Sequence, residues 1–283
     1  MKEALYYQKL EANKVQCQLC PKRCIIVPGK RGFCAVRKNV DGTLYSEIYG
    51  QTTSVALDPI EKKPLYRFHP GTFILSLGTR GCNFACPYCQ NWHISQDPDA
   101  FTQPITSSEI IRQAKKARSI GIAYTYNEPI IWYEFVLDTA QVAKNEGLKN
   151  VLVTNGYINP EPLRELMPFI DALNIDLKSM EDSFYRKYCS ATLQPVLETI
   201  KTAAKSAHVE LTNLVIPTLN DKEENFEKLR DWIFENLGAE VPLHFSRYFP
   251  CCKMRIPPTP LKTLERAREI VVQKLKYVYL GNI

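Results

Sequence analysis

From residue 72 onward, short apolar runs alternate with longer segments whose apolar residues recur at helical spacing. The segment after residue 106 begins with Thr106-Ser107-Ser108-Glu109, the sequence of a helix capping box. The predicted strands are 73–77, 123–126, 151–154, 172–177, 209–216, 243–246 and 277–280, and the predicted helices are 107–119, 130–147, 160–169, 194–206, 222–236 and 260–275. Strands that are separated by single helices favour a parallel sheet with helices outside it. The pattern therefore predicts an α/β fold, a partial (β/α)6-type barrel that is open on one side.

The first 65 residues follow a different pattern and are predicted to form a small cysteine-rich module, with the barrel occupying 66–283. Their cysteines have the spacing C-x2-C-x3-C-x9-C, and prolines and glycines between them exclude a long helix. Four such thiolates can bind zinc or an iron–sulfur cluster, and the spacing does not decide between the two. The four residues are Cys17, Cys20, Cys24 and Cys34. The polar, proline-bounded segment 58–66 is interpreted as a surface linker between the two parts.

Three more cysteines, Cys82, Cys86 and Cys89, have the spacing C-x3-C-x2-C directly after the first predicted barrel strand. Three thiolates on one loop can bind a single metal centre, but a structural zinc or a cubane cluster usually takes four ligands. Two interpretations follow. A [4Fe–4S] cluster held by three cysteines leaves one iron open to an outside molecule, whereas His93 as fourth ligand would complete a Cys3His zinc site.

Polar side chains stand at the ends of the later predicted strands. In a barrel of parallel strands these ends lie on one rim, where functional residues gather, so we expect the side chains to share a pocket with the cysteine loop. The pairs are Asn127 and Glu128, Thr154 and Asn155, Asp176 and Lys178, and His244 and Arg247.

The cysteine spacing, with the aromatic Tyr88 before the last cysteine, resembles the radical S-adenosylmethionine (SAM) superfamily. The resemblance implies a [4Fe–4S] cluster on the three cysteines that cleaves SAM to a 5′-deoxyadenosyl radical, with the cofactor supplying the difficult chemistry. The segment 126–129 is similar to the Glu-Pro half of the SAM-binding Gly-Gly-Glu-Pro segment of pyruvate formate-lyase activating enzymes. Asp176-Leu177-Lys178 matches their Asp-Leu-Lys segment, and 153–156 matches their Asp-Thr-Asn-Gly segment without its leading carboxylate.

In those enzymes the first of these segments binds the SAM amino group and the other two lie near the SAM carboxylate. The resemblance therefore implies that the rim residues and Tyr88 bind the cofactor, and that a flavodoxin or ferredoxin supplies electrons. A longer set of motifs resembles the AmmeMemoRadiSam-system radical SAM proteins. That set comprises the four-cysteine opening, 58–65, 81–92, 126–129, 244–250 and 279–282.

The main functional hypothesis is a radical SAM enzyme that abstracts hydrogen from a carbon of a protein or peptide. Modification of a small metabolite is the alternative among enzymes, and a non-catalytic iron–sulfur or zinc protein that carries electrons or acts as a scaffold is the competing class. Cys189 follows the Asp-Leu-Lys strand, where its thiol could return a hydrogen atom to a substrate radical; the simpler interpretation is a buried structural cysteine.

Composition and charge indicate which binding partners and which cellular compartment to expect. The net charge of +6 is spread along the 283 residues without a basic block, which does not favour nucleic-acid binding. No apolar run approaches the roughly 20 residues that span a bilayer, so no membrane partner is expected. The N-terminus lacks the apolar core of a signal peptide, and we expect cytoplasmic residence.

Overall fold

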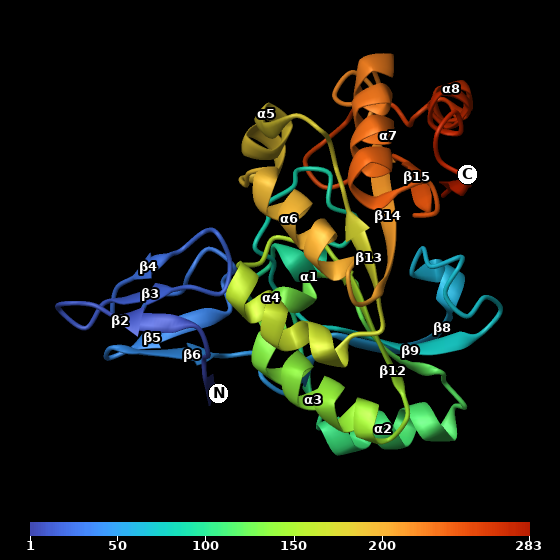
Figure 1. The fold of residues 1–283 in the computed structure, drawn as a ribbon. Helices are drawn as coiled ribbons and strands as arrows, with labels where there is room; N and C mark the ends of the chain where they lie inside the picture. Colours follow the sequence, from blue (N-terminus) through green and yellow to red (C-terminus); the bar gives the residue numbers. More distant parts are fainter.

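A curved eight-stranded sheet forms the centre of the protein, and the computed structural model describes residues 1–283 (Figure 1). The strand order is β16-β15-β14-β13-β12-β11-β9-β8. All neighbours from β9 to β16 are parallel, whereas β8 pairs with β9 in antiparallel fashion. The strands are β8 (Ser54–Pro59), β9 (Phe73–Gly78), β11 (Gly121–Tyr124), β12 (Lys149–Thr154), β13 (Ala172–Asp176), β14 (His208–Val215), β15 (Leu243–Arg247) and β16 (Val278–Gly281). Because β8 and β16 do not pair, the barrel is open, as the sequence predicted.

A helix crosses between each pair of consecutive parallel strands and packs on the outside of the sheet. The predicted capping box is present, since the Thr106 side chain accepts a hydrogen bond from the Glu109 amide at the start of α2. The helices are α1 (Trp92–Ser95), α2 (Ser107–Lys116), α3 (Tyr133–Asn145), α4 (Pro160–Leu166), α5 (Asp182–Phe184), α6 (Gln194–Ala203), α7 (Glu223–Leu237) and α8 (Leu261–Val271). Short non-α turns are η1 (Ile60–Lys62), η2 (Pro129–Trp132), η3 (Met167–Phe169) and the π-helical turn η4 (Tyr185–Cys189).

The N-terminal cysteine-rich part consists of short antiparallel strands that project to one side of the barrel (Figure 1). One three-stranded sheet has the order β1-β6-β5 and another the order β2-β3-β4, while β7 pairs with β10 from the barrel. The strands are β1 (Lys2–Glu3), β2 (Tyr7–Lys9), β3 (Val15–Cys17), β4 (Ile25–Ile26), β5 (Arg37–Val40), β6 (Thr43–Ser46), β7 (Gln51–Thr52) and β10 (Gln103–Pro104). The division of the chain at residue 65 stays a prediction, and β8, which precedes that residue, is part of the central sheet.

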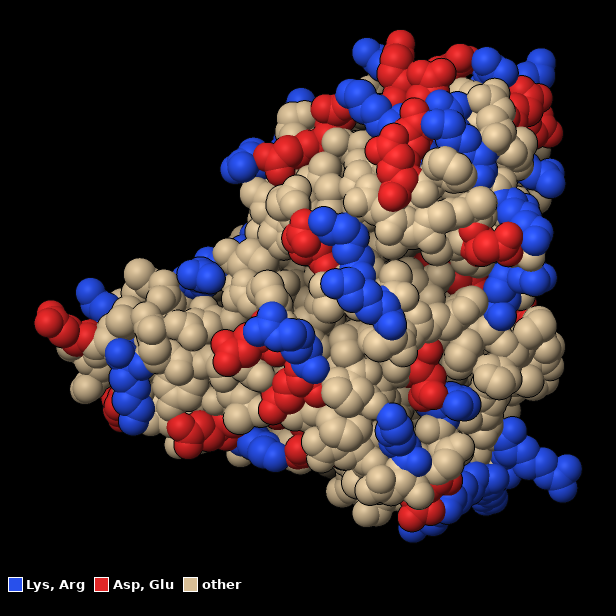
Figure 2. Space-filling model, viewed as in Figure 1, with Lys and Arg blue, Asp and Glu red and all other residues tan.

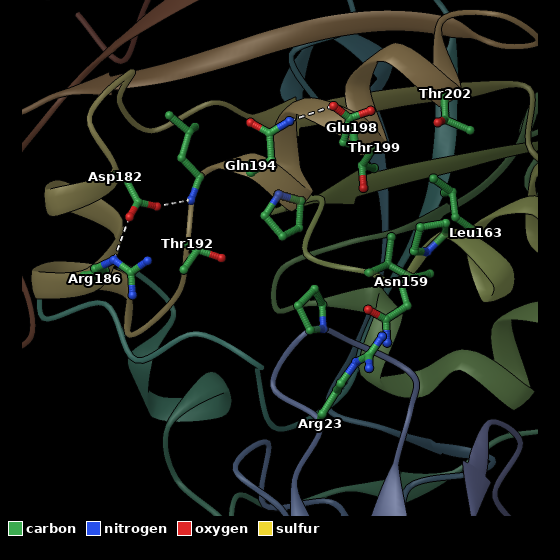
Figure 3. A pocket seen from close by; sticks show the side chains of 15 residues that line it. Arg23, Asn159, Leu163, Asp182, Arg186, Thr192, Gln194, Glu198, Thr199 and Thr202 are labelled. Atoms are coloured by element: carbon green, nitrogen blue, oxygen red, sulfur yellow. Dashed lines mark hydrogen bonds and ion pairs between the residues drawn. The ribbon is translucent and has the colours of Figure 1, made fainter.

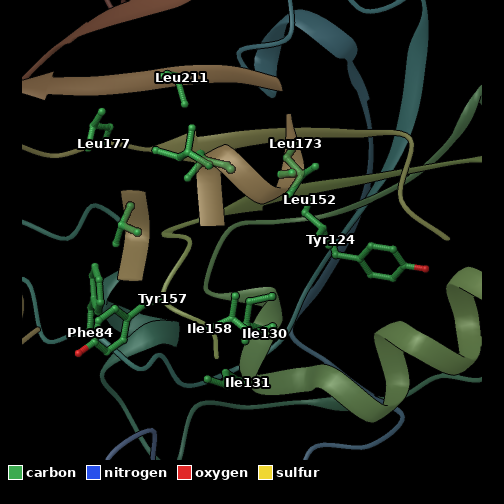
Figure 4. Close-up of a cluster of buried hydrophobic side chains, with 14 of the residues drawn as sticks. Phe84, Tyr124, Ile130, Ile131, Leu152, Tyr157, Ile158, Leu173, Leu177 and Leu211 are labelled. Atoms are coloured by element: carbon green, nitrogen blue, oxygen red, sulfur yellow. The ribbon is translucent and has the colours of Figure 1, made fainter. Parts of the chain in front are cut away.

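Apolar side chains fill the space between the sheet and its helices. Tyr124, Leu152, Leu173 and Leu211, one from each of four adjacent strands, are buried together with Ile130 of η2 (Figure 4). Because side chains alternate between the faces of a strand, the residues next to them point into the barrel. Ala123, Val151 and Ala172 are such inner residues, and they form a second, smaller core with Ile74 of β9 and with Ile60 and Leu65.

The interpretation of 58–66 as a surface linker is wrong. Asp58 lies in the edge strand β8, and Asp58, Lys63 and Leu65 are all buried. Lys63 Nζ lies 2.7 Å from Asp58 Oδ2, so the two charges neutralise each other and can leave water. Further along, the Tyr66 ring packs against the Tyr279 ring of β16, with 4.8 Å between centroids. The segment therefore runs from one edge of the sheet to the other and fills the end of the barrel at which the parallel strands begin.

None of the helices combines the length and the apolar character that crossing a bilayer requires.

Candidate active site

The loop after β9 carries the three closely spaced cysteines and is fixed at both ends by asparagine side chains. Asn127 accepts a hydrogen bond from the Thr79 amide and donates one to the Gly81 carbonyl at 2.8 Å. Asn91, just after the loop, donates to the Tyr126 carbonyl at 2.6 Å. Gly81 has φ +88°, a conformation that glycine adopts without steric cost. These bonds join the loop to the end of the neighbouring strand β11.

The donors beside two of the three sulfurs suit thiolate ligands. The Phe84 amide lies 3.3 Å from Cys82 Sγ, and the Ser95 hydroxyl lies 3.1 Å from Cys89 Sγ. Burial raises the pKa of Cys82 well above its ordinary value, so a thiolate at this position needs a positive partner such as a metal. The chemistry and spacing of this donor set fit an iron–sulfur cluster.

The zinc alternative finds no support in the geometry. His93 is exposed on α1, and its ring faces Trp92.

Glu128 lies buried beside the cysteine loop and is held by three donors. Its Oε1 accepts hydrogen bonds from the Ile130 amide at 2.9 Å and the Thr154 hydroxyl at 2.7 Å, and its Oε2 accepts one from the Asn155 amide at 2.7 Å. Burial raises the pKa of Glu128 to about 7. Asn155 also points its side-chain amide toward Cys82 Sγ at 3.8 Å. The structure thus brings together Glu128, Thr154, Asn155 and the first cysteine of the loop.

On the other side of the loop, the Asp-Leu-Lys segment and Cys189 meet Cys86. Lys178 Nζ pairs with Asp176 Oδ2 at 2.8 Å, and the positive charge of Lys178 also acts on Cys86. Cys189, at the end of η4, is fully buried next to Cys86, and the Tyr88 hydroxyl lies 3.3 Å from its sulfur. This contact orients Tyr88 toward Cys189. The turn η4 that carries Cys189 is π-helical, and single π-helical turns occur frequently at functional sites.

The structure does not bring His244 and Arg247 to this group. His244 lies within β15, and its Nε2 is 2.6 Å from Glu210 Oε2. Arg247 donates to the Thr259 carbonyl at 2.8 Å and stacks its guanidinium on Phe249. A cofactor role for these two residues therefore stays a prediction without support from their contacts.

Two features next to the site were not predicted. The Tyr126 hydroxyl donates to Asp58 Oδ2 at 2.5 Å, and Lys63 Nζ lies 4.5 Å above the Tyr126 ring, although Tyr126 is 68 positions from Asp58. The Cys251 thiol lies 3.4 Å from the Cys89 carbonyl. The segment 58–66 carried two signals, a charged pair at short spacing and the family resemblance of 58–65, whereas the Cys251 loop gave no local signal.

The four N-terminal cysteines line one small hollow, together with Asn83 from the cysteine loop of the barrel. A larger groove of about 710 Å³ lies outside the barrel, between the N-terminal part and the helices α4 and α6 (Figure 3). Arg23, Asn159, Asp182 and Glu198 line it, and none of the three barrel cysteines does. The groove is therefore separate from the candidate site.

Acidic and basic side chains are interspersed over most of the face seen in Figure 2.

Comparisons with known proteins place these features in context. A family model for the radical SAM superfamily matches residues 76–233. The chain is 49% identical over 288 residues to an uncharacterized protein of Methanocaldococcus jannaschii, a match that covers 100% of this chain and 86% of the relative. It is 24% identical over 213 residues to the pyruvate formate-lyase 1-activating enzyme of Escherichia coli, covering 69% of this chain and 86% of that enzyme.

Solved structures show a similar fold. Streptococcus suis SuiB bound to S-adenosylmethionine superposes with a TM-score of 0.58 at 14% identity, covering 74% of this chain and 52% of that chain. A radical SAM methyltransferase from Sphaerobacter thermophilus gives 0.57 at 15% identity, covering 75% and 67%. At these identities the likeness concerns the fold alone.

Proposed function

Since the chain belongs to the radical SAM superfamily, as its motifs predicted, we propose that Cys82, Cys86 and Cys89 hold a [4Fe–4S] cluster with one iron left for SAM. The cluster supplies the electron that cleaves SAM to a 5′-deoxyadenosyl radical, which abstracts hydrogen from a protein or peptide substrate. A flavodoxin or ferredoxin is the proposed electron donor. The observation that carries the proposal is the carboxylate of Glu128, which is buried beside the first cysteine of the loop.

Glu128 can accept one more hydrogen bond. An ionised carboxylate has about four acceptor positions, and three are filled by the donors of Ile130, Thr154 and Asn155. A SAM amino group at the remaining position would offset the burial that now raises the pKa of Glu128. The protein thus holds a carboxylate in place for a cationic or hydrogen-bonding ligand.

Lys178 provides the complementary charge. Its ammonium group has three donors, and Asp176 accepts from one of them at 2.8 Å. A free donor here can bind a carboxylate such as that of SAM, close to Cys86. Asp176 and Lys178 would then orient the methionine part of the cosubstrate from the side opposite Glu128.

A protein or peptide as substrate is supported by the names of the relatives. They include activating enzymes of pyruvate formate-lyase and of (2S)-3-sulfopropanediol dehydratase, the latter from Klebsiella oxytoca and 28% identical over 122 residues. Radical modification of a small metabolite would use the same SAM site, and a substrate screen separates the two.

Anaerobic reconstitution followed by reduction with SAM tests the enzyme class. We expect 5′-deoxyadenosine to form; a cluster that is reduced without cleaving SAM would instead indicate an electron carrier. Deuterium transfer from labelled candidate peptides or metabolites into 5′-deoxyadenosine then identifies the substrate.

Replacing Glu128 by alanine tests the role of this residue. We expect the iron content to stay the same and the affinity for SAM to fall roughly 10- to 100-fold, because hydrogen bonds to charged groups contribute about 1.5–3 kcal/mol. Equilibrium dialysis with labelled SAM measures this. Glu227→Ala, at an exposed position of α7, is the matched control. Unchanged SAM affinity in the Glu128 variant would remove the residue from the binding site.

A further inference from the structure

The four N-terminal cysteines surround one hollow although they come from separate turns. Cys17 ends β3, Cys20 and Cys24 lie in the loop between β3 and β4, and Cys34 precedes β5. All four line the hollow, and the apolar residues Leu19, Ile26, Phe33 and Ile131 line it with them. Such a shell limits the access of water, which is one way in which proteins tune metal centres.

Two of the four sulfurs also have a hydrogen-bond donor beside them. The Phe33 amide lies 3.4 Å from Cys24 Sγ, and Arg37 Nη1 lies 3.8 Å from Cys17 Sγ. Clusters of iron and sulfide carry net negative charge on their thiolates, and donors to the sulfurs stabilise that charge.

Four thiolates around one hollow can hold either a zinc ion, at about 2.3 Å from each sulfur, or a cubane cluster, in which each thiolate binds a different iron. The neighbouring loop of the barrel carries the donor set of an iron–sulfur cluster. A chain that is loaded with iron and sulfide at that loop receives the components of a second cluster as well, which favours the cluster here.

The hollow adjoins the cysteine loop of the barrel. A Cβ built on Gly81, the residue before Cys82, would lie 2.6 Å from the Cys34 carbonyl oxygen, so the two loops are in direct contact. Asn83 lines the hollow and accepts a hydrogen bond at 2.8 Å from the same Asn155 amide that points toward Cys82.

From these observations we propose that Cys17, Cys20, Cys24 and Cys34 bind a second, fully cysteine-ligated [4Fe–4S] cluster, seated against the loop that holds the first. The inference shares the first cluster with the proposed function, but the second cluster does not depend on SAM cleavage. Because the loops touch, two reduced clusters would lie near enough for their unpaired electrons to interact magnetically.

Metal analysis of anaerobically reconstituted variants tests the proposal. We expect about eight irons per chain in the unaltered protein and about four after replacing Cys82, Cys86 and Cys89 by alanine. We also expect about four in the double variant Cys20→Ala/Cys24→Ala. Cys252→Ala, which alters a cysteine of neither set, should keep about eight. Zinc in place of iron in the triple variant, or no metal in a triple variant that circular dichroism shows to be folded, would overturn the proposal.

A measurement on the unaltered protein avoids any folding defect of the variants. Mössbauer spectra with and without SAM should show about half of the iron responding to SAM, and electron paramagnetic resonance of the fully reduced protein should show broadening that the triple variant lacks. A total of about four irons, all responding to SAM, would refute the second cluster. Eight irons without any 5′-deoxyadenosine would refute the proposed function and leave the second cluster standing.

Discussion

Arg37 and Glu134 form a buried ion pair that joins the N-terminal part to the barrel. Arg37 lies on β5 and Glu134 in the first turn of α3, and each side chain is 1% exposed. Their partners include the backbone of Leu5, whose amide donates to Glu134 Oε1 at 2.8 Å and whose carbonyl accepts from Arg37 Nη1 at 2.9 Å. Removing either side chain would leave the other charge buried without its partner.

We therefore expect Arg37→Met to lower the free energy of unfolding by about 3–5 kcal/mol, the usual cost of breaking a buried pair. This is a large fraction of the 5–15 kcal/mol by which proteins are typically stable. The midpoint of thermal unfolding should fall by roughly 6–20 °C. Urea unfolding of the reduced, metal-free protein, followed by circular dichroism, measures the loss without a contribution from metal at Cys17.

The double variant Arg37→Met/Glu134→Met separates the pair from its surroundings. It should lose less stability than either single variant, because no uncompensated charge remains and apolar replacements of buried pairs are often neutral. Arg266→Met removes an exposed pair with Glu223, whose side chains are 50% and 55% exposed, and should cost far less stability than either single variant of the buried pair. Single-variant losses below 1 kcal/mol that simply add in the double variant would refute the reasoning.

Two further predictions concern the barrel interior and the contact between the cysteine loops. Burial alone would raise the pKa of Glu210, but hydrogen bonds from His208, His244 and two backbone amides lower it to about 2. Because the folded protein holds this carboxylate ionised, up to about 3 kcal/mol of stability should be lost as the pH falls from about 4.5 to 2. Glu210→Gln should flatten this part of the pH dependence of urea unfolding, and an unchanged slope would contradict the assignment. Gly81→Ala should cost more than Gly29→Ala in the same assay, because both have positive φ but only Gly81 has atoms within 4 Å of the added Cβ; equal losses would mean that the loops separate easily.

Periodicity and spacing predicted most of the architecture and the centre of the site. Each predicted barrel strand and helix is present, because alternating apolar runs report directly which face of an element is buried. The three barrel cysteines were proposed as ligands from local spacing alone. Glu128 was proposed from its place after a strand, where parallel strand ends converge on one rim.

Other features depended on partners that lie far away in the sequence. The sequence predicted that Lys63 and Asp58 are exposed, because no neighbouring residue indicates that Tyr126 binds Asp58 and packs against Lys63 inside the barrel. Cys189 meets Cys86 only because η4 returns the chain to the loop, which spacing does not reveal. His244 shows the reverse case, since a polar residue near a strand end pairs within the sheet with Glu210.

The segment 58–66 limits the ways into the barrel. Tyr66 and Arg67 donate their amides to Glu210, and the Arg67 guanidinium stacks on Tyr277 beside β16, so the chain itself covers the end at which the parallel strands begin. A ligand that needs the interior would therefore enter from the opposite end, where the cysteine loop lies, or through the gap between β8 and β16.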